Sequence, residues 1–98
     1  MVRKVIFSSK ADNDLTGIIE YLKSEWSASQ IRNFNSILDR KLEIIVNYPY
    51  SYPSILNNKN IRKCVLTKQI SLFYLIKKDI IFILRLFDSR SNPSKLKL

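Results

Sequence analysis

The period of the apolar positions changes once along the chain, from a helical repeat in the first half to alternation in the second. A short β-branched and aromatic cluster at 5–7 predicts a strand within residues 2–8. Two series of apolar residues at steps of three and four follow, and they predict helices at 9–26 and 27–47. The first half of the chain should therefore be a strand followed by a helical hairpin.

Each predicted helix has its own start signal. Ser9 followed by Asp12 resembles a capping box in which Asp replaces the usual Glu or Gln. Ser27 followed by Gln30 offers a second box of the same spacing. The second helix should end before Pro49, because proline biases the residue that precedes it away from helical angles.

The second half of the chain predicts three strands. Runs with period two occupy 61–66, 70–76 and 80–86, and the three-residue connections between them can join only antiparallel neighbours. The third run is apolar at nearly every position, which is typical of a strand in the interior of a sheet. Residues 48–60 are predicted to form one long loop, and the tail 87–98 has no helical period.

These elements predict one α+β domain over residues 1–98, because a chain of 98 residues rarely divides. The order β-α-α-β-β-β places a helical hairpin on one face of a twisted, mainly antiparallel, four-stranded sheet. Which face the helices cover does not follow from the pattern.

Charge is distributed unevenly along this domain. The chain has 17 basic and 8 acidic residues, a net charge of +9. Residues 1–58 hold seven basic and six acidic side chains, whereas residues 59–98 hold ten basic and two acidic ones. A half of charge +8 favours a polyanionic partner, such as nucleic acid or an acidic protein segment.

The residue inventory excludes several kinds of site. Without histidine and with Cys64 as its single cysteine, the chain cannot build a zinc site, a Cys-His or Ser-His-Asp nucleophile, or an internal disulfide. No apolar run approaches the roughly 20 residues of a membrane span, and the N-terminus lacks a secretory signal. We expect a cytoplasmic protein without membrane association.

The chain carries a series of different short motifs, in a fixed order, over almost its whole length. They are Ser9-x-Ala11-x-x-Asp14-Leu15, Tyr21-Leu22, Trp26, Phe34, Leu38, Pro49, Pro53, Ile61-Arg62-Lys63-Cys64-Val65-Leu66-Thr67-Lys68, Phe73-Tyr74-x-Ile76, Ile83-Leu84-Arg85-Leu86 and Asp88-x-Arg90-x-x-Pro93. With these pieces the chain resembles the RelE/ParE superfamily of toxins from bacterial type II toxin–antitoxin systems, and it is closer to the ParE-like side.

The resemblance implies a protein that arrests bacterial growth until a cognate antitoxin neutralises it in a hetero-oligomer. ParE-like members act on DNA gyrase, whereas RelE-like members cut messenger RNA on the ribosome. Neither activity implies a cofactor or a metal ion. Because one fold can host both activities, the site must decide between them.

A metal-independent ribonuclease needs an acid, a base and cations at the scissile phosphate. RelE-like nucleases combine Lys and Arg on the sheet with a C-terminal Tyr, and that Tyr is absent here. If the chain were a nuclease, the candidate catalytic residues would be Arg62, Lys63, Lys68, Tyr74 and Arg85. The alternation groups Tyr74 with Leu72 and Ile76, which favours core packing over catalysis for this tyrosine.

A second reading gives the basic residues a binding role. The candidates for contact with a target or an antitoxin are Arg62, Lys63, Lys68, Arg85 and Arg90. For Arg85, a structural ion pair and a partner contact are equally open. For Arg62 and Arg90, partner contact is slightly favoured.

The hypotheses are therefore a ParE-like toxin acting on gyrase, a ribosome-dependent mRNA endoribonuclease, and a non-toxic basic nucleic-acid-binding module. Either toxin should bind an acidic antitoxin segment that folds as an amphipathic helix or an added strand. The tyrosines at 48, 50 and 52 suit protein recognition or packing against the helical hairpin.

Overall fold

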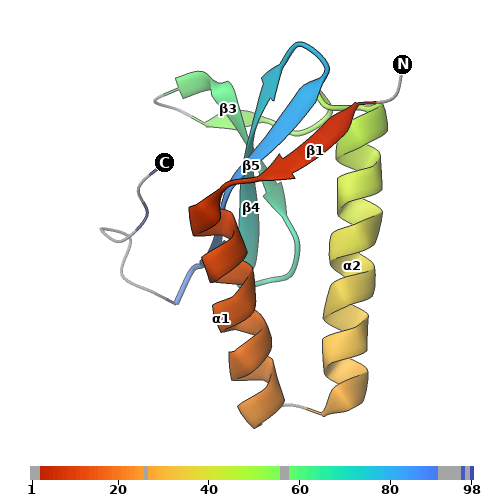
Figure 1. Ribbon diagram of the computed structural model, residues 1–98, viewed down its shortest axis with the longest axis vertical. Coiled ribbons are helices and arrows are strands. Elements are labelled where there is room, and N and C mark those ends of the chain that lie inside the picture. Colours follow the sequence, from red (N-terminus) through yellow and green to blue (C-terminus); the bar gives the residue numbers. More distant parts are fainter. Residues whose placement is uncertain (1–2, 26, 56–57, 91–95, 97) are drawn as a thin grey trace.

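Figure 1 shows the protein as a computed structural model that describes residues 3–25, 27–55, 58–90, 96 and 98. The elements along the chain are β1 (Lys4–Phe7), α1 (Ser9–Glu25), α2 (Ala28–Asn47), β2 (Ser54–Ile55), β3 (Asn58–Val65), β4 (Ile70–Lys77) and β5 (Ile80–Asp88). The α+β class and the predicted order of elements are confirmed. No helix within these ranges is both long and apolar enough to cross a membrane.

The strand count differs from the prediction by one. Four strands were expected, and the described residues form five, because β2 lies inside the segment predicted as a loop. Ser54 follows Pro53, whose fixed φ favours extended backbone, and it pairs antiparallel with Arg62 of β3. The long loop is thus partly a short edge strand.

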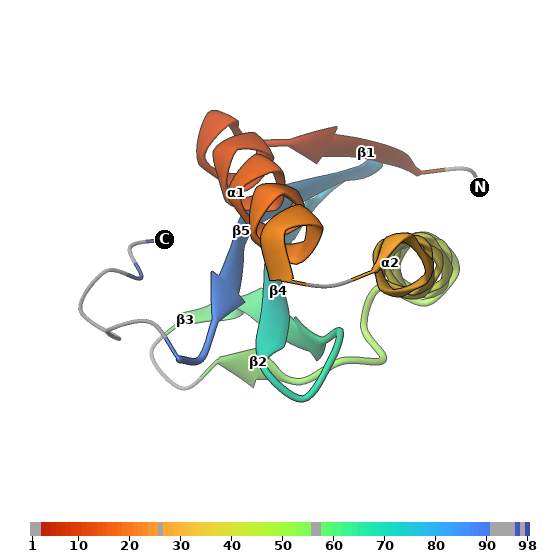
Figure 2. The ribbon, with the colours of Figure 1, turned by 90° about the horizontal axis from the view of Figure 1, so that it is seen from below.

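The sheet is mixed, with the strand order β1-β5-β4-β3-β2. Strand β1 runs parallel to β5, and the other neighbouring pairs are antiparallel. The apolar strand β5 lies between β1 and β4, which confirms that it is an interior strand. In Figure 2 α2 is seen nearly end on and α1 obliquely, with α1 close to β5.

A bulge interrupts the alternation of β5. Tyr74 of β4 is opposite Ile83 and Phe73 is opposite Arg85, so Leu84 is an extra residue. Ile83 and Leu86 are consequently both buried although they are three positions apart. The uniformly apolar sequence of this strand gave no sign of the shift.

The N-cap of helix α1 lies one residue before the predicted Ser9. The hydroxyl of Ser8 accepts a hydrogen bond from Ala11 N at 3.0 Å, which makes Ser8 the N-cap instead of Ser9. The same hydroxyl donates to Leu84 O at 2.8 Å. Ser8 is preferred because its hydroxyl both caps the helix and donates to the carbonyl of Leu84, which lies on β5 just beyond the residues that pair with β1.

Helix α2 begins and ends as predicted. Ser27 N donates to Gln30 Oε1 at 2.9 Å and Gln30 N donates to Ser27 Oγ at 3.4 Å, so the capping box is present. The helix ends at Asn47, two residues before Pro49. Arg3 donates to Val46 O at 3.0 Å and thereby satisfies one carbonyl of the last turn.

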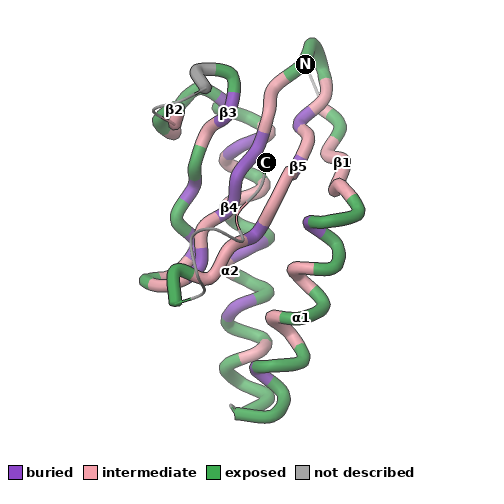
Figure 3. The backbone as a smooth tube through the Cα atoms, turned by 90° about the vertical axis from the view of Figure 1, so that its left-hand side faces the viewer, coloured by how far each residue is buried: buried purple, intermediate pink, exposed green. Residues whose placement is uncertain are grey.

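The core lies between the helices and one face of the sheet, as the buried positions in Figure 3 show. Its buried members are Ala11, Leu22, Phe34, Leu38, Ile45, Cys64, Leu66, Ile70, Leu72, Tyr74, Ile81, Ile83 and Leu86. The covered face is therefore the one that holds Cys64, Leu72 and Tyr74. Cys64 is fully buried, as expected of a small hydrophobic residue. Trp26, expected at the end of the first helix, lies outside the described residues.

Candidate partner-binding groove

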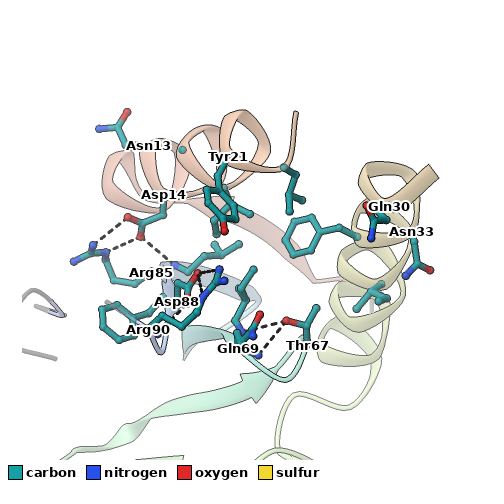
Figure 4. Close-up of a pocket in the computed structure, with 18 residues that line it drawn as sticks. Asn13, Asp14, Tyr21, Gln30, Asn33, Thr67, Gln69, Arg85, Asp88 and Arg90 are labelled. Carbon is teal, nitrogen blue, oxygen red and sulfur yellow. Dashed lines mark hydrogen bonds and ion pairs between the residues drawn. The ribbon is translucent and has the colours of Figure 1, made fainter. Parts of the chain in front are cut away.

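An open groove of about 490 Å³ lies between the two helices at the end of the sheet (Figure 4). Its walls are the middle of α1, the N-terminal half of α2, the β3–β4 turn and the end of β5. A partner side chain can enter this groove without displacing a secondary-structure element.

The wall formed by α1 contains a gap and an exposed ring. Gly17 and Tyr21 are one helical step of four apart, so they share a face of the helix. A Cβ atom at Gly17 would meet no atom within 4 Å, so the glycine leaves open space in the groove. Tyr21 is 44% exposed, although its ring borders an apolar surface.

The floor of the groove is apolar. Leu22 and Phe34 of the helices and Ile70 and Leu86 of the sheet are buried and line it from below. The exposed residues at the mouth on α2 include Gln30. An apolar floor below a polar mouth suits the apolar face of an amphipathic helix.

An ion pair joins α1 to β5 at one side of the groove. Arg85 donates from Nε to Asp14 Oδ2 at 2.7 Å and from Nη2 to Oδ1 at 3.0 Å. The same carboxylate accepts Leu86 N at 3.1 Å, beyond the residues that β1 covers. These hydrogen bonds raise the pKa of Arg85 above its ordinary value. Of the two roles left open for Arg85, the structural ion pair is present.

A second ion pair forms the rim. Arg90 donates from Nε to Asp88 Oδ1 at 3.0 Å, and its guanidinium lies 5.3 Å from the centroid of the Tyr21 ring. Hydrogen bonds from Arg90 lower the pKa of Asp88. The two carboxylates and two guanidinium groups that line the groove are thus paired with one another, and their charges cancel.

Arg62 and Tyr74 lie elsewhere, at the loop that follows α2. Arg62 Nη1 donates to Tyr52 O at 2.6 Å and to Tyr50 O at 3.4 Å. Tyr74 has no exposed surface, and its hydroxyl donates to Pro49 O at 2.6 Å. Burial raises the pKa of Tyr74 to about 12. Both side chains hold backbone carbonyls in this structure.

The remaining two candidates are exposed lysines. Lys63 of β3 is paired with Phe73 of β4, which is paired in turn with Arg85 of β5. One residue earlier on β3, Arg62 is paired with Tyr74. Because adjacent residues of a strand point to opposite faces, Lys63 does not share a face with those two residues. Lys68 lies in the β3–β4 turn.

The structure therefore does not assemble the candidate nuclease residues at one place. Of the predicted binding residues, Arg85 and Arg90 line the groove, Lys68 lies between the lining residues Thr67 and Gln69 without lining it, and Arg62 and Lys63 are not part of its lining. Within the described part of the chain, no three His, Cys, Asp or Glu residues are grouped as a metal site would require.

Sequence reasoning missed Gly17 and Tyr21 as parts of a site. The available signals were a glycine within a regular helical repeat and a tyrosine beside the apolar stripe. Neither signal indicates a groove until the second helix and the end of β5 are in position.

Several solved structures share this fold. A chain of the chromosomal ParDE toxin–antitoxin system from P. aeruginosa matches with a TM-score of 0.73 at 15% identity, over 89% of this chain and 96% of that one. A chain of the DinJ–YafQ toxin–antitoxin complex from E. coli matches with a TM-score of 0.64 at 12% identity, over 92% and 96%. The YoeB dimer from Staphylococcus aureus matches with a TM-score of 0.64 at 13% identity, over 89% and 97%. A search of curated protein sequences found no match.

The sequence itself matches a family model over residues 5–93, which takes in both helices, β1 from its second residue, the other four described strands and the residues that line the groove. The model is described as the ParE toxin of the type II toxin–antitoxin system parDE. The chain therefore belongs to the ParE toxin family, within the RelE/ParE superfamily that its sequence resembles.

Proposed function

We propose that this toxin arrests growth by binding DNA gyrase and that its antitoxin docks in the groove between α1 and α2. The observation that carries the proposal is the dispersal of the groups a nuclease would need. Tyr74 and Arg62 hold loop carbonyls, and Arg85 holds Asp14. A chain whose cations and tyrosine are used in this way is better suited to binding than to cleaving phosphodiester bonds.

The groove suits an amphipathic helix of the antitoxin. Its floor is apolar and its charged residues pair with one another, so apolar contacts provide most of the affinity there. The toxin–antitoxin complexes among the structural matches support an antitoxin partner for this chain. The +8 charge of residues 59–98 attracts an acidic antitoxin and speeds the encounter.

An in vitro supercoiling assay tests the gyrase assignment. Purified toxin at micromolar concentration should inhibit supercoiling of relaxed plasmid by gyrase, and an equimolar amount of antitoxin should restore it. A supercoiling rate unchanged by the toxin would rule out gyrase as the target.

A parallel assay tests the nuclease alternative. Translated messenger RNA from cells that express the toxin should show no new cuts placed by codon position. Such cuts, if they disappear in the double variant Arg62→Ala/Arg85→Ala, would overturn the binding mechanism and restore the mRNA endoribonuclease.

A further inference from the structure

The loop that follows α2 is held in place from beneath by side chains of the sheet. Tyr74 binds Pro49 O, and Arg62 binds Tyr50 O and Tyr52 O. Ser51 donates to Tyr48 O from both its backbone nitrogen, at 3.1 Å, and its hydroxyl, at 2.7 Å. The backbone carbonyls of residues 48, 49, 50 and 52 thus all accept hydrogen bonds from side chains. Pro49, within this stretch, is buried.

Two aromatic side chains of this fixed loop remain in solvent. Tyr48 is 69% exposed and Tyr50 is 67% exposed, whereas Tyr52 packs against the core. A tyrosine on a fixed backbone loses little conformational entropy when a partner covers it, and its ring supplies a large contact area. Exposed tyrosines on rigid loops are typical of binding hot spots.

Cations surround the same loop. The guanidinium of Arg62 lies 5.0 Å from the Tyr50 ring centroid, and Lys41 Nζ lies 5.9 Å from that of Tyr52. Arg3 binds the last turn of α2, just before Tyr48. The carboxylate nearest in the sequence is that of Glu43, one helical turn before the end of α2. This arrangement is complementary to an acidic surface.

We infer that the loop 48–52 is the surface through which the toxin grips its target, and that the target presents an acidic protein patch there. The inference rests on the proposed function, because it requires a toxin that acts by binding. The loop is distinct from the groove. Tyr48 lies eleven residues beyond Ile37, the last groove residue of α2, which corresponds to about 16 Å along the helix.

A single-stranded nucleic acid is the competing occupant, because it also uses aromatic rings and cations. The structure favours protein because Arg62 covers one face of the Tyr50 ring and uses Nη1 for loop carbonyls. A base could stack on the other face of that ring only, whereas its edge and hydroxyl, which are the parts of tyrosine that protein interfaces use, stay accessible at 67% exposure.

The test is the double variant Tyr48→Ala/Tyr50→Ala, which removes exposed side chains and the contact of Arg62 with the Tyr50 ring but leaves the hydrogen bonds to the loop carbonyls in place. Growth arrest should be lost, and affinity for gyrase holoenzyme should fall at least tenfold. Affinity for the antitoxin should stay within twofold. Tyr21→Ala is the matched control, since it removes an exposed tyrosine at the groove and should weaken the antitoxin while growth arrest persists.

The outcomes separate the two proposals. If the wild-type toxin arrests growth without binding gyrase, the gyrase assignment fails, and loss of arrest in the double variant still supports the loop. Unchanged arrest in the double variant overturns the loop assignment, as does an equal loss of antitoxin binding. Binding of a fluorescent single-stranded oligonucleotide that depends on both tyrosines overturns the protein target. A wild-type toxin that neither arrests growth nor binds gyrase overturns both proposals.

Discussion

The groove and the 48–52 loop are two surfaces of one small domain that use the same residue types in opposite ways. At the groove, arginines pair with carboxylates and the proposed antitoxin surface is the apolar floor that remains. At the loop, an arginine and a buried tyrosine hold backbone carbonyls, and the proposed target surface is a pair of exposed rings. An arginine within a strand is therefore no guide to where a partner binds, because its neighbours decide whether it contacts the partner or supports another residue.

The largest effect should come from removing the ion pair that joins α1 to β5. Asp14→Ala leaves the mostly buried Arg85 without its carboxylate and Leu86 N without an acceptor. The free energy of unfolding should fall by about 2–3 kcal/mol in chemical denaturation. Asp88→Ala is the control, since its ion pair is at the exposed rim and should change stability little. Equal losses of unfolding free energy in the two variants would contradict the distinction between the ion pair that joins α1 to β5 and the ion pair at the rim.

The next effect concerns the buried support of the loop. Tyr74→Phe removes the hydroxyl that binds Pro49 O and should lower the free energy of unfolding by about 1–2 kcal/mol. Growth arrest should weaken as well, because the loop loses one of its fixed points. Tyr50→Phe, at an exposed ring, should leave stability unchanged.

The same tyrosine gives a pH dependence with a definite sign. Burial raises the pKa of Tyr74 from 10.0 to about 12, so the folded state favours the neutral phenol. The stability that this provides is complete below pH 10 and is lost as the pH rises toward 12. Burial also raises the pKa of Tyr52 to about 12, so Tyr74→Phe should remove only part of the alkaline decline. Denaturation midpoints measured between neutral and alkaline pH would show whether the decline is shared.

The smallest change in stability is expected at Gly17, where two substitutions test stability and antitoxin binding separately. Gly17→Ala should stabilise the toxin by about 1 kcal/mol, because alanine is the better helix former and its Cβ meets open space. Gly17→Trp should leave the fold intact and fill the groove, so that antitoxin affinity falls at least tenfold. An antitoxin that binds the Gly17→Trp variant normally would show that the groove is not its docking site.

The helices and the three long strands could be predicted from the sequence because their apolar positions follow one period each. The bulge at Leu84 could not be predicted, since one extra residue in a uniformly apolar strand leaves the pattern unchanged. Ser8 and Ser9 are equivalent as capping residues until β5 supplies a carbonyl to one of them. β2 has two residues, too few for an alternation.

The candidate site was less predictable than the fold for a related reason. Partner contact was slightly favoured for Arg62, and in the structure its guanidinium binds a carbonyl of a loop ten residues earlier in the sequence. Backbone carbonyls have no sequence signature, so a side chain that binds them looks the same as one that awaits a ligand. Tyr74 illustrates the same point, although alternation alone placed it correctly in the core.

The parallel pairing of the first and last strands also bears on how the molecule is made. Lys4 of β1 is opposite Ile80 of β5. β1 is synthesised before β5 and has no partner strand until nearly all of the described sequence has been made. Contacts of such long range close late, because the intervening chain must be ordered first. Translation thus has to pass both helices and three further strands before the first strand can join the sheet.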